Sequence, residues 1–183
     1  MSNPKIAQKY LLTSERLGFR NWMASDIPKM TQISADKTVM EYFPAPATPE
    51  QTAGFILKMQ QLFTEKGYCY FAVEELQSQA FIGFIGLSDK DFEAEFTPCV
   101  DIGWRLDKAH WRKGYATEGA KRCLEYAFDS LALTEIKATA PCINHKSISV
   151  MEKIGMQQEL IFGHPLLPQN ERLKKCVCYG ISK

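Results

Sequence analysis

The hydrophobic and polar positions along the chain follow two periods, one typical of strands and the other typical of helices. Short segments that alternate, or that are apolar throughout, predict about seven strands. These strands are expected at residues 16–20, 68–76, 80–88, 99–106, 135–140, 156–162 and 173–181. Apolar residues at steps of three and four predict about four helices, which begin near Ser25, Thr48, Thr117 and Asn144.

The order of these elements predicts the fold class. Strands and helices mix along 183 residues, a length that suits one core, so we expect residues 1–183 to form a single domain. The polar residues 77–79 join two strands as a hairpin. We therefore expect an α/β (α+β) fold with one mixed, mostly antiparallel, twisted sheet flanked by helices. Strands 99–106 and 135–140 enclose a helix, so they are expected to run parallel or to splay apart.

A strand, a basic turn and a helix follow one another over residues 101–118, and this arrangement is typical of an anion site. The first amides of a helix have no intrahelical partner, and the helix dipole places partial positive charge beside them. Arg112 and Lys113 add full charges at the turn. Gly114 and Ala116 leave little side chain between a ligand and the backbone. The sequence therefore predicts that this turn holds a pyrophosphate.

The composition narrows the classes of partner. Apolar residues make up 45% of the chain and charged residues 23%, with a formal net charge of +1. This balance argues against a nucleic-acid-binding or membrane-surface protein. No apolar run reaches the roughly 18 residues of a membrane span, and the N-terminus lacks the apolar core of a signal peptide. We therefore expect a soluble cytoplasmic protein.

The cysteines and histidines do not have the spacing of metal ligands. Six cysteines are scattered along the chain without a C-x-x-C pair, and three histidines are present. Zinc sites need closer and more regular spacing. The sequence therefore predicts free thiols and no metal.

The turn itself lacks two common nucleotide fingerprints. Neither G-x-x-x-x-G-K-[ST] nor an early G-x-G-x-x-G occurs in the chain. Instead, residues 111–116 read Trp-Arg-Lys-Gly-Tyr-Ala and resemble the phosphate turn Q/R-x-x-G-x-G/A of the GCN5-related N-acetyltransferase (GNAT) superfamily. Trp111 stands where Gln or Arg is usual. With an aromatic residue at this position, the turn resembles that of the subgroup that acetylates the N-terminal alanine or serine of ribosomal proteins.

Other segments resemble the same subgroup, and together they span most of the chain in the order of that family. They are residues 13–17, 101–106, 111–118, 144–149 and 152–156. The resemblance implies the GNAT fold, a single domain, and acetyl-CoA as the co-substrate for transfer to an amine acceptor.

The resemblance also implies where acetyl-CoA would bind. The pantetheine arm would contact the backbone of Trp104, Arg105 and Leu106, in a gap between strands 99–106 and 135–140. The pyrophosphate would rest on the turn, and the start of the late helix would flank the thiol. The turn residues are Trp111, Arg112, Lys113, Gly114, Tyr115, Ala116 and Thr117, and the helix residues are Asn144 and Ser147.

Asp101 and Ser147 are the candidates for proton transfer. Direct attack by an amine needs one group that takes up the amine proton and another that protonates the leaving thiolate. Asp101 resembles the acidic residue that family members often have near the acceptor amine. Many members use a late-helix tyrosine as the acid, but Met151 stands at that position, so Ser147 is the nearest substitute. Glu118 opens a helix, where a carboxylate is more typical of structure than of catalysis.

The sequence leaves the acceptor and the class of activity open. The subgroup implies a protein N-terminal α-amine, and the alternative is a small amine such as a polyamine, an amino sugar or an antibiotic. The acidic residues that could attract a polyamine are Asp89, Asp91, Glu93 and Glu95. A non-catalytic acyl-CoA-binding module and a nucleotide-binding protein are interpretations from other classes. A monomer and a homodimer are both compatible with the sequence.

Overall fold

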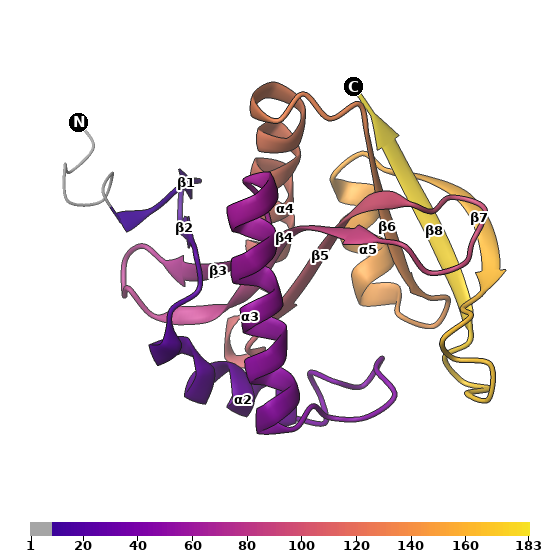
Figure 1. Ribbon diagram of the computed structural model, residues 1–183, viewed down its shortest axis with the longest axis horizontal. Coiled ribbons are helices and arrows are strands. Elements are labelled where there is room, and N and C mark those ends of the chain that lie inside the picture. Colours follow the sequence, from indigo (N-terminus) through magenta and orange to yellow (C-terminus); the bar gives the residue numbers. More distant parts are fainter. Residues whose placement is uncertain (1–8) are drawn as a thin grey trace.

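A computed structural model describes residues 9–183, which form one sheet of eight strands with helices on both faces (Figure 1). Across the sheet the strands follow the order β1-β2-β3-β4-β5-β6-β8-β7. Their bounds are β1 Leu12–Thr13, β2 Leu17–Arg20, β3 Tyr70–Glu75, β4 Phe81–Lys90, β5 Cys99–Leu106, β6 Glu135–Pro141, β7 Gln157–Gly163 and β8 Lys175–Ser182. Of the neighbouring pairs, β5 and β6 run parallel and the others run antiparallel, so the expected mixed sheet is confirmed.

Along the chain, the helices of the described residues lie between these strands. The four α-helices are α2 Ile27–Ala35, α3 Pro49–Lys66, α4 Tyr115–Glu125 and α5 His145–Lys153. The shorter turns are η1 Ala24–Asp26, η2 Lys108–His110 and the π-helical η3 Tyr126–Ser130. None of these helices is long and apolar enough to cross a membrane.

The ends of α3 follow directly from its sequence. Thr48 accepts a hydrogen bond from the Gln51 amide at 3.2 Å, and the Gln51 side chain accepts one from the Thr48 amide at 2.9 Å. This capping box, with Pro49 in the first turn, fixes the start of the helix. Gly67 ends it with a left-handed backbone at φ 77°. The start agrees with the prediction of a helix that begins near Thr48.

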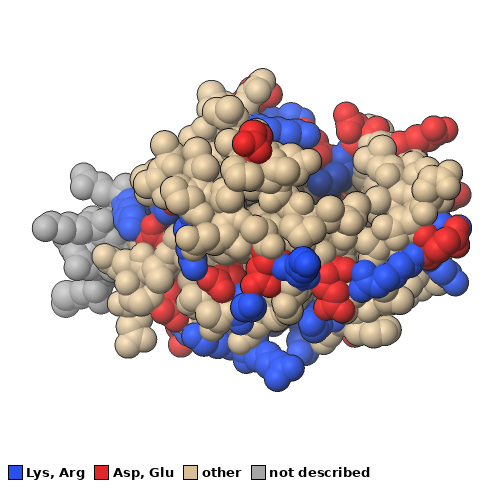
Figure 2. Space-filling model, turned by 90° about the horizontal axis from the view of Figure 1, so that it is seen from below, with Lys and Arg blue, Asp and Glu red and all other residues tan. Residues whose placement is uncertain are grey.

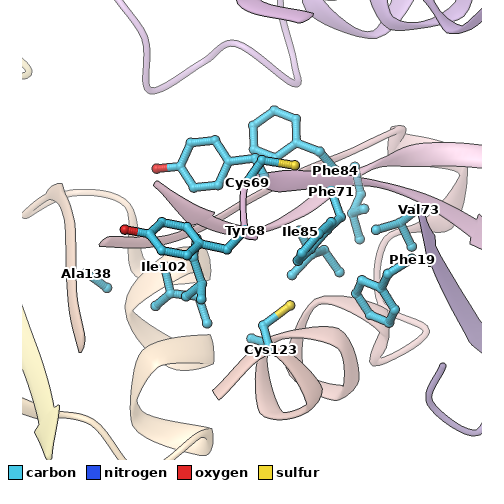
Figure 3. Close-up of a cluster of buried hydrophobic side chains, with 14 of the residues drawn as sticks. Phe19, Tyr68, Cys69, Phe71, Val73, Phe84, Ile85, Ile102, Cys123 and Ala138 are labelled. Atoms are coloured by element: carbon cyan, nitrogen blue, oxygen red, sulfur yellow. The ribbon is translucent and has the colours of Figure 1, made fainter. Parts of the chain in front are cut away.

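The core lies on both faces of the sheet. On one face, Phe55 of α3 packs on Phe84 with ring centroids 5.1 Å apart. On the other face, a Cβ added to Gly119 of α4 would lie 2.4 Å from the Ile85 side chain, so glycine lets the helix approach the strand closely. Figure 3 shows Cys123 of α4 on the same face as Ile85, with Phe84 on the opposite face.

Two differences from the prediction change the number of strands and the start of the helix after the basic turn, while other boundaries shift by one or two residues. The sheet has eight strands because Leu12 and Thr13 add a two-residue edge strand, which is too short to give a periodic pattern. The helix after the basic turn begins at Tyr115 instead of Thr117, since Gly114 takes the N-cap position, and its last part is the π-helical η3.

The feature that prepares the functional site is the separation of β5 from β6. These parallel strands share a register contact at Asp101 and Lys137, whereas β4 pairs with β5 along the whole of β5. Beyond Asp101 the two strands diverge, and Figure 1 shows β6 leaving the direction of β5. The sequence predicted that these strands run parallel or splay apart, and the structure shows both: they are parallel at Asp101 and splay apart beyond it.

Charged side chains of both signs are mixed on one face of the molecule. On the face seen in Figure 2, acidic and basic residues alternate along one band instead of forming separate patches. This distribution agrees with a formal net charge of +1.

Candidate active site

The turn before α4 has a backbone shape suited to an anion. Arg112 and Gly114 both have left-handed backbone angles, with φ 62° and φ 83°. Gly114 is the N-cap of α4 and has no side chain to offer as a cap, so the amides of residues 115–117 are left to an outside acceptor. A Cβ at Gly114 would be strained at this φ and would lie 3.4 Å from the Arg16 guanidinium.

Arg16 and Glu118 hold this turn against the start of β2. The Glu118 carboxylate accepts hydrogen bonds from the Ser14 hydroxyl (2.7 Å), the Arg16 amide (2.8 Å) and Arg16 Nε (2.7 Å). Arg16 also donates to the Lys113 carbonyl at 3.0 Å and stacks on the Tyr115 ring at 4.7 Å. Burial raises the pKa of Glu118, but these hydrogen bonds outweigh it and lower the pKa overall. Glu118 therefore has the structural use expected of it.

The edge of β5 presents backbone groups to the gap beside β6. The Asp107 amide donates to the Ile82 carbonyl of β4 at 2.8 Å. Since alternate residues of a strand direct their backbone groups to the same neighbour, Trp104 and Leu106 direct theirs away from β4 and toward the gap. Trp111 Nε1 donates to the Leu106 carbonyl at 2.8 Å, which folds the turn back over the end of β5. The pantetheine contact of residues 104–106 stays a prediction.

Asp101 lies where β5 and β6 separate, and its side chain is buried. The carboxylate accepts a hydrogen bond from the Tyr70 hydroxyl and another from the backbone amide of Thr139 on β6. Burial raises the pKa of Asp101 to about 6, against the opposing effects of Lys90 and of both hydrogen bonds. A carboxyl group with such a pKa is mostly ionised at neutral pH and is still able to take up a proton.

Two glycines open the path by which Tyr70 reaches Asp101. Tyr70 of β3 pairs with Gly86 of β4, and Gly86 pairs with Gly103 of β5. A Cβ on Gly103 would lie 3.0 Å from the Tyr70 ring, so the ring extends across two strands where side chains are absent. Burial, together with the nearby Asp101 charge, raises the pKa of Tyr70 well above its ordinary value. The phenol therefore stays protonated and acts as a hydrogen-bond donor.

Asn144 and Ser147 lie in the first turn of α5. Asn144 Oδ1 accepts a hydrogen bond from the Ser147 amide at 3.1 Å, so the Asn144 side chain caps the helix. Met151, one turn later, is 2% exposed, so an apolar side chain fills the place of the missing tyrosine. Lys146 lies over the Trp111 ring at 5.0 Å and connects this helix to the basic turn.

The charges nearest to Asp101 and Tyr70 are basic. Lys90 Nζ lies 5.2 Å from the Tyr70 ring centroid, and the Arg105 guanidinium lies 5.3 Å from the Phe84 ring. The four acidic residues that could attract a polyamine are either paired with other side chains or exposed. Asp89 bonds to Lys66 and Tyr68, while Asp91, Glu93 and Glu95 are exposed.

Three side chains of this site were given no side-chain role by the sequence. They are Arg16, which supports the turn, Tyr70, which bonds to Asp101, and Arg105, whose expected role involved its backbone alone. For Tyr70 the available signal was the pair Gly86 and Gly103. That pair becomes meaningful only when the register of β4 and β5 is known.

Comparison with known proteins identifies the family. Residues 16–157 match the family described as "Acetyltransferase (GNAT) domain". The chain is 32% identical to the uncharacterized N-acetyltransferase YnaD of Bacillus subtilis, over 92% of this chain and 89% of that protein. The crystal structure of a GNAT-family acetyltransferase from Bacillus anthracis is similar with a TM-score of 0.78 and 29% identity, and the match covers 93% of this chain and 97% of that one.

Two other solved structures share the fold at lower identity. The ribosomal-protein-S5-alanine acetyltransferase of Vibrio fischeri has a TM-score of 0.74 and 19% identity, over 93% of this chain and 94% of that one. The spermidine N-acetyltransferase of Vibrio cholerae, in complex with CoA and spermine, has a TM-score of 0.73 and 20% identity, over 91% and 95%. The family match and the sheet with its splayed β5 and β6 lead to one conclusion: the chain belongs to the GNAT family of acetyltransferases.

Proposed function

We propose that this GNAT acetyltransferase transfers the acetyl group of acetyl-CoA to a primary amine, foremost the α-amine of a protein N-terminus, with Asp101 as the general base. The observation that carries the proposal is the buried Asp101 at the point where β5 and β6 separate, with a pKa raised to about 6. A carboxylate in this state fits the removal of a proton from an attacking amine.

The basic turn and the first turn of α4 are the groups proposed to hold the phosphates of acetyl-CoA. The left-handed backbone at Arg112 and Gly114 and the uncapped start of the helix fit a pyrophosphate. Arg112 and Lys113 supply positive charge beside these amides. When bound, acetyl-CoA supplies the thioester carbonyl that the amine attacks.

Proton transfer is assigned to two side chains of this chain. Asp101 takes the proton that the amine loses when it bonds to the acetyl carbon, either directly or through water. Tyr70 and the Thr139 amide hold the carboxylate in position through their hydrogen bonds. Ser147 is proposed as the donor to the leaving thiolate, with its own proton replaced from water, because buried Met151 has no proton to give. The Asn144 cap fixes the turn of α5 that carries Ser147.

The properties of the site favour an α-amine over a polyamine. An α-amine has a pKa of about 7.7–8.0, whereas an alkylamine such as that of lysine has a pKa of about 10.4. The pKa of a base near 6 is closer to the pKa of the α-amine than to that of the alkylamine, so proton transfer from the α-amine is less unfavourable. Lys90 and Arg105 beside the site also repel a polycation. The two structures with named acceptors have nearly equal TM-scores, so the fold does not decide between these acceptors.

Thiol release from acetyl-CoA tests the proposal. Peptides that begin with alanine or serine, spermidine and an amino sugar serve as acceptors, and mass spectrometry locates the acetyl group. We expect turnover with the peptides, and Asp101→Asn should lower kcat/KM by about 10²- to 10⁴-fold while the affinity for CoA is kept. Preference for spermidine, or no thiol release with any amine, would contradict the proposal.

A further inference from the structure

Arg105 places a guanidinium on the same face of β5 as Asp101, among apolar rings. Residues 101, 103 and 105 share one face because side chains alternate along a strand. The guanidinium lies 4.3 Å from the Phe43 ring centroid and 5.3 Å from that of Phe84. Phe43 is itself 40% exposed, so the two rings cover the guanidinium only in part, and they attract it through their faces without supplying a counter-ion.

This guanidinium has no carboxylate partner among residues 9–183. NH1 donates to the Ser34 hydroxyl of α2 at 3.3 Å, and Nε is buried with no hydrogen-bond partner within the same residues. Burial lowers the pKa of Arg105 to about 10, and the nearby Tyr70 only partly opposes this. Arg105 as a residue is only partly buried, but its Nε is a buried polar atom without a hydrogen-bond partner, which is unfavourable in a folded protein.

Asp101 does not act as that counter-ion. If the two side chains formed an ion pair, the pKa of the carboxyl group would fall and that of the guanidinium would rise. Burial instead raises the first and lowers the second, and Tyr70 takes the hydrogen bond to the carboxylate. The two charges thus stay separate along one face of β5.

A second polar group near Ser34 also lacks a partner. The Thr31 hydroxyl is buried and has no hydrogen-bond partner within the described part of the chain. Thr31 and Ser34 are three residues apart in α2, so they lie on neighbouring positions of one helix face. Arg105 Nε and the Thr31 hydroxyl are thus unsatisfied polar atoms on two elements that touch through Ser34, and each needs an explanation such as a ligand oxygen.

We propose that Arg105 and Ser34 form a carboxylate subsite, so that the acceptor carries a carboxylate in addition to its amine. This inference rests on the proposed function, because it describes the acceptor of the same site. The fork of the guanidinium matches the two oxygens of a carboxylate, and its buried Nε is a free donor within the described residues. The carboxylate comes either from a free amino acid or from an acidic side chain near the N-terminus of a peptide.

The phosphates of acetyl-CoA are a poor match for this position. The basic turn that is suited to them lies between the end of β5 and the start of α4. Arg105 instead faces α2 through Ser34 and the α2–α3 loop through Phe43. The group that binds there therefore belongs to the acceptor.

Matched acceptors that differ in one carboxylate test the subsite. In the peptide arm, Ala-Asp and Ala-Asn peptides of otherwise equal sequence are compared, and in the amino-acid arm glycine is compared with glycinamide. Wild-type enzyme should prefer the carboxylate member of at least one pair by about 10- to 100-fold in kcat/KM, the range for charge-assisted hydrogen bonds. Arg105→Gln should remove this preference, and Arg105→Lys should restore only part of it.

Arg122→Gln is the matched control, since Arg122 of α4 donates to the Thr13 carbonyl of β1 and lies away from Arg105. It should keep the wild-type preference. Circular dichroism verifies folding of each variant, and Ser34→Ala replaces Arg105→Gln if the latter does not fold. Equal rates for both members of each pair in wild-type enzyme, or a preference that survives Arg105→Gln, would overturn the subsite while leaving the acetyltransferase assignment intact.

A binding measurement separates failure of the subsite from failure of the proposed reaction. Calorimetry, with CoA present, compares product-like probes that differ in one carboxylate: N-acetyl-Ala-Asp amide with N-acetyl-Ala-Asn amide, and N-acetylglycine with N-acetylglycinamide. Tighter binding of the carboxylate member of either pair that is lost in Arg105→Gln supports the subsite even if no tested amine is acetylated. Equal binding of both members of each pair to wild-type protein would contradict it.

Discussion

Removal of the Tyr70 hydroxyl should move the acidic limb of the pH–rate profile to higher pH. Tyr70→Phe keeps the ring that lies over Gly103 and deletes only the donor to Asp101. That donor stabilises the ionised carboxylate, because its hydrogen bond lowers the pKa of Asp101. Without it, the pKa of Asp101 rises above about 6, and the base is protonated over a wider pH range.

The size of the effect follows from the energy of one hydrogen bond. A hydrogen bond to a charged group contributes about 1.5–3 kcal/mol, and one pKa unit corresponds to about 1.36 kcal/mol. The pKa of Asp101 should therefore increase by roughly one to two units, to between about 7 and 8. At pH 7 the ionised fraction, and with it kcat/KM, should fall roughly 2- to 10-fold. At pH 9 most of the activity should return.

The assay is thiol release between pH 5.5 and 9 at subsaturating acceptor. The ratio of wild-type to variant kcat/KM cancels the titration of the amine, which both enzymes share. Tyr68→Phe is the control, because Tyr68 donates to Asp89 at 2.6 Å and removal of its hydroxyl does not touch Asp101. A ratio for Tyr70→Phe that is constant with pH would refute the role of Asp101 as the titrating base.

Three further predictions concern stability and the basic turn. The pKa of Asp101 is raised from 3.8 to about 6, so stability is lost as pH rises through about 6. In urea unfolding, Asp101→Asn should therefore match wild type near pH 4 and be more stable by up to about 3 kcal/mol at pH 8. Glu118→Gln should weaken the support of the turn and raise the KM for acetyl-CoA by about 3- to 10-fold with little change in kcat, whereas an unchanged KM would argue against that support. Gly119→Ala should destabilise the protein by about 1–3 kcal/mol because its Cβ would meet Ile85, while Gly54→Ala, in open space on α3, should stabilise it by about 0.5–1 kcal/mol in the same unfolding assay.

The elements that the sequence predicted well are those with local causes. The start of α3 depends on Thr48, Pro49 and Gln51, which are neighbours in the chain. The strand-turn-helix order around the basic turn likewise depends on a few consecutive residues, although Gly114 at the N-cap starts the helix at Tyr115, two residues before the predicted start. Local signals of this kind need no knowledge of the tertiary structure.

The contacts at Asp101 and Arg105 could not be predicted because they depend on strand register. Tyr70 meets Asp101 only because β3 and β4 pair so that Gly86 and Gly103 leave room for the ring. The sequence assigned Arg105 a backbone contact only, and the direction of its side chain follows from the alternation along β5. No local pattern determines how β3, β4 and β5 align, so the contact between Tyr70 and Asp101, which are 31 residues apart in the chain, could not be predicted.

The spacing of Asp101 and Arg105 leads to a last prediction about the acceptor. They are four residues apart on one strand, which separates their Cα atoms by about 13 Å. The amine and carboxylate of one amino acid lie within about the 3.8 Å between successive Cα atoms, too short to reach both charges unless the Arg105 side chain folds far back. An acidic side chain at the second or third residue of a peptide spans more of this distance. We therefore expect peptides with aspartate or glutamate there to have a higher kcat/KM than free amino acids, by at least 10-fold. Faster acetylation of glycine than of such peptides would refute this geometry and favour a small amino-acid acceptor.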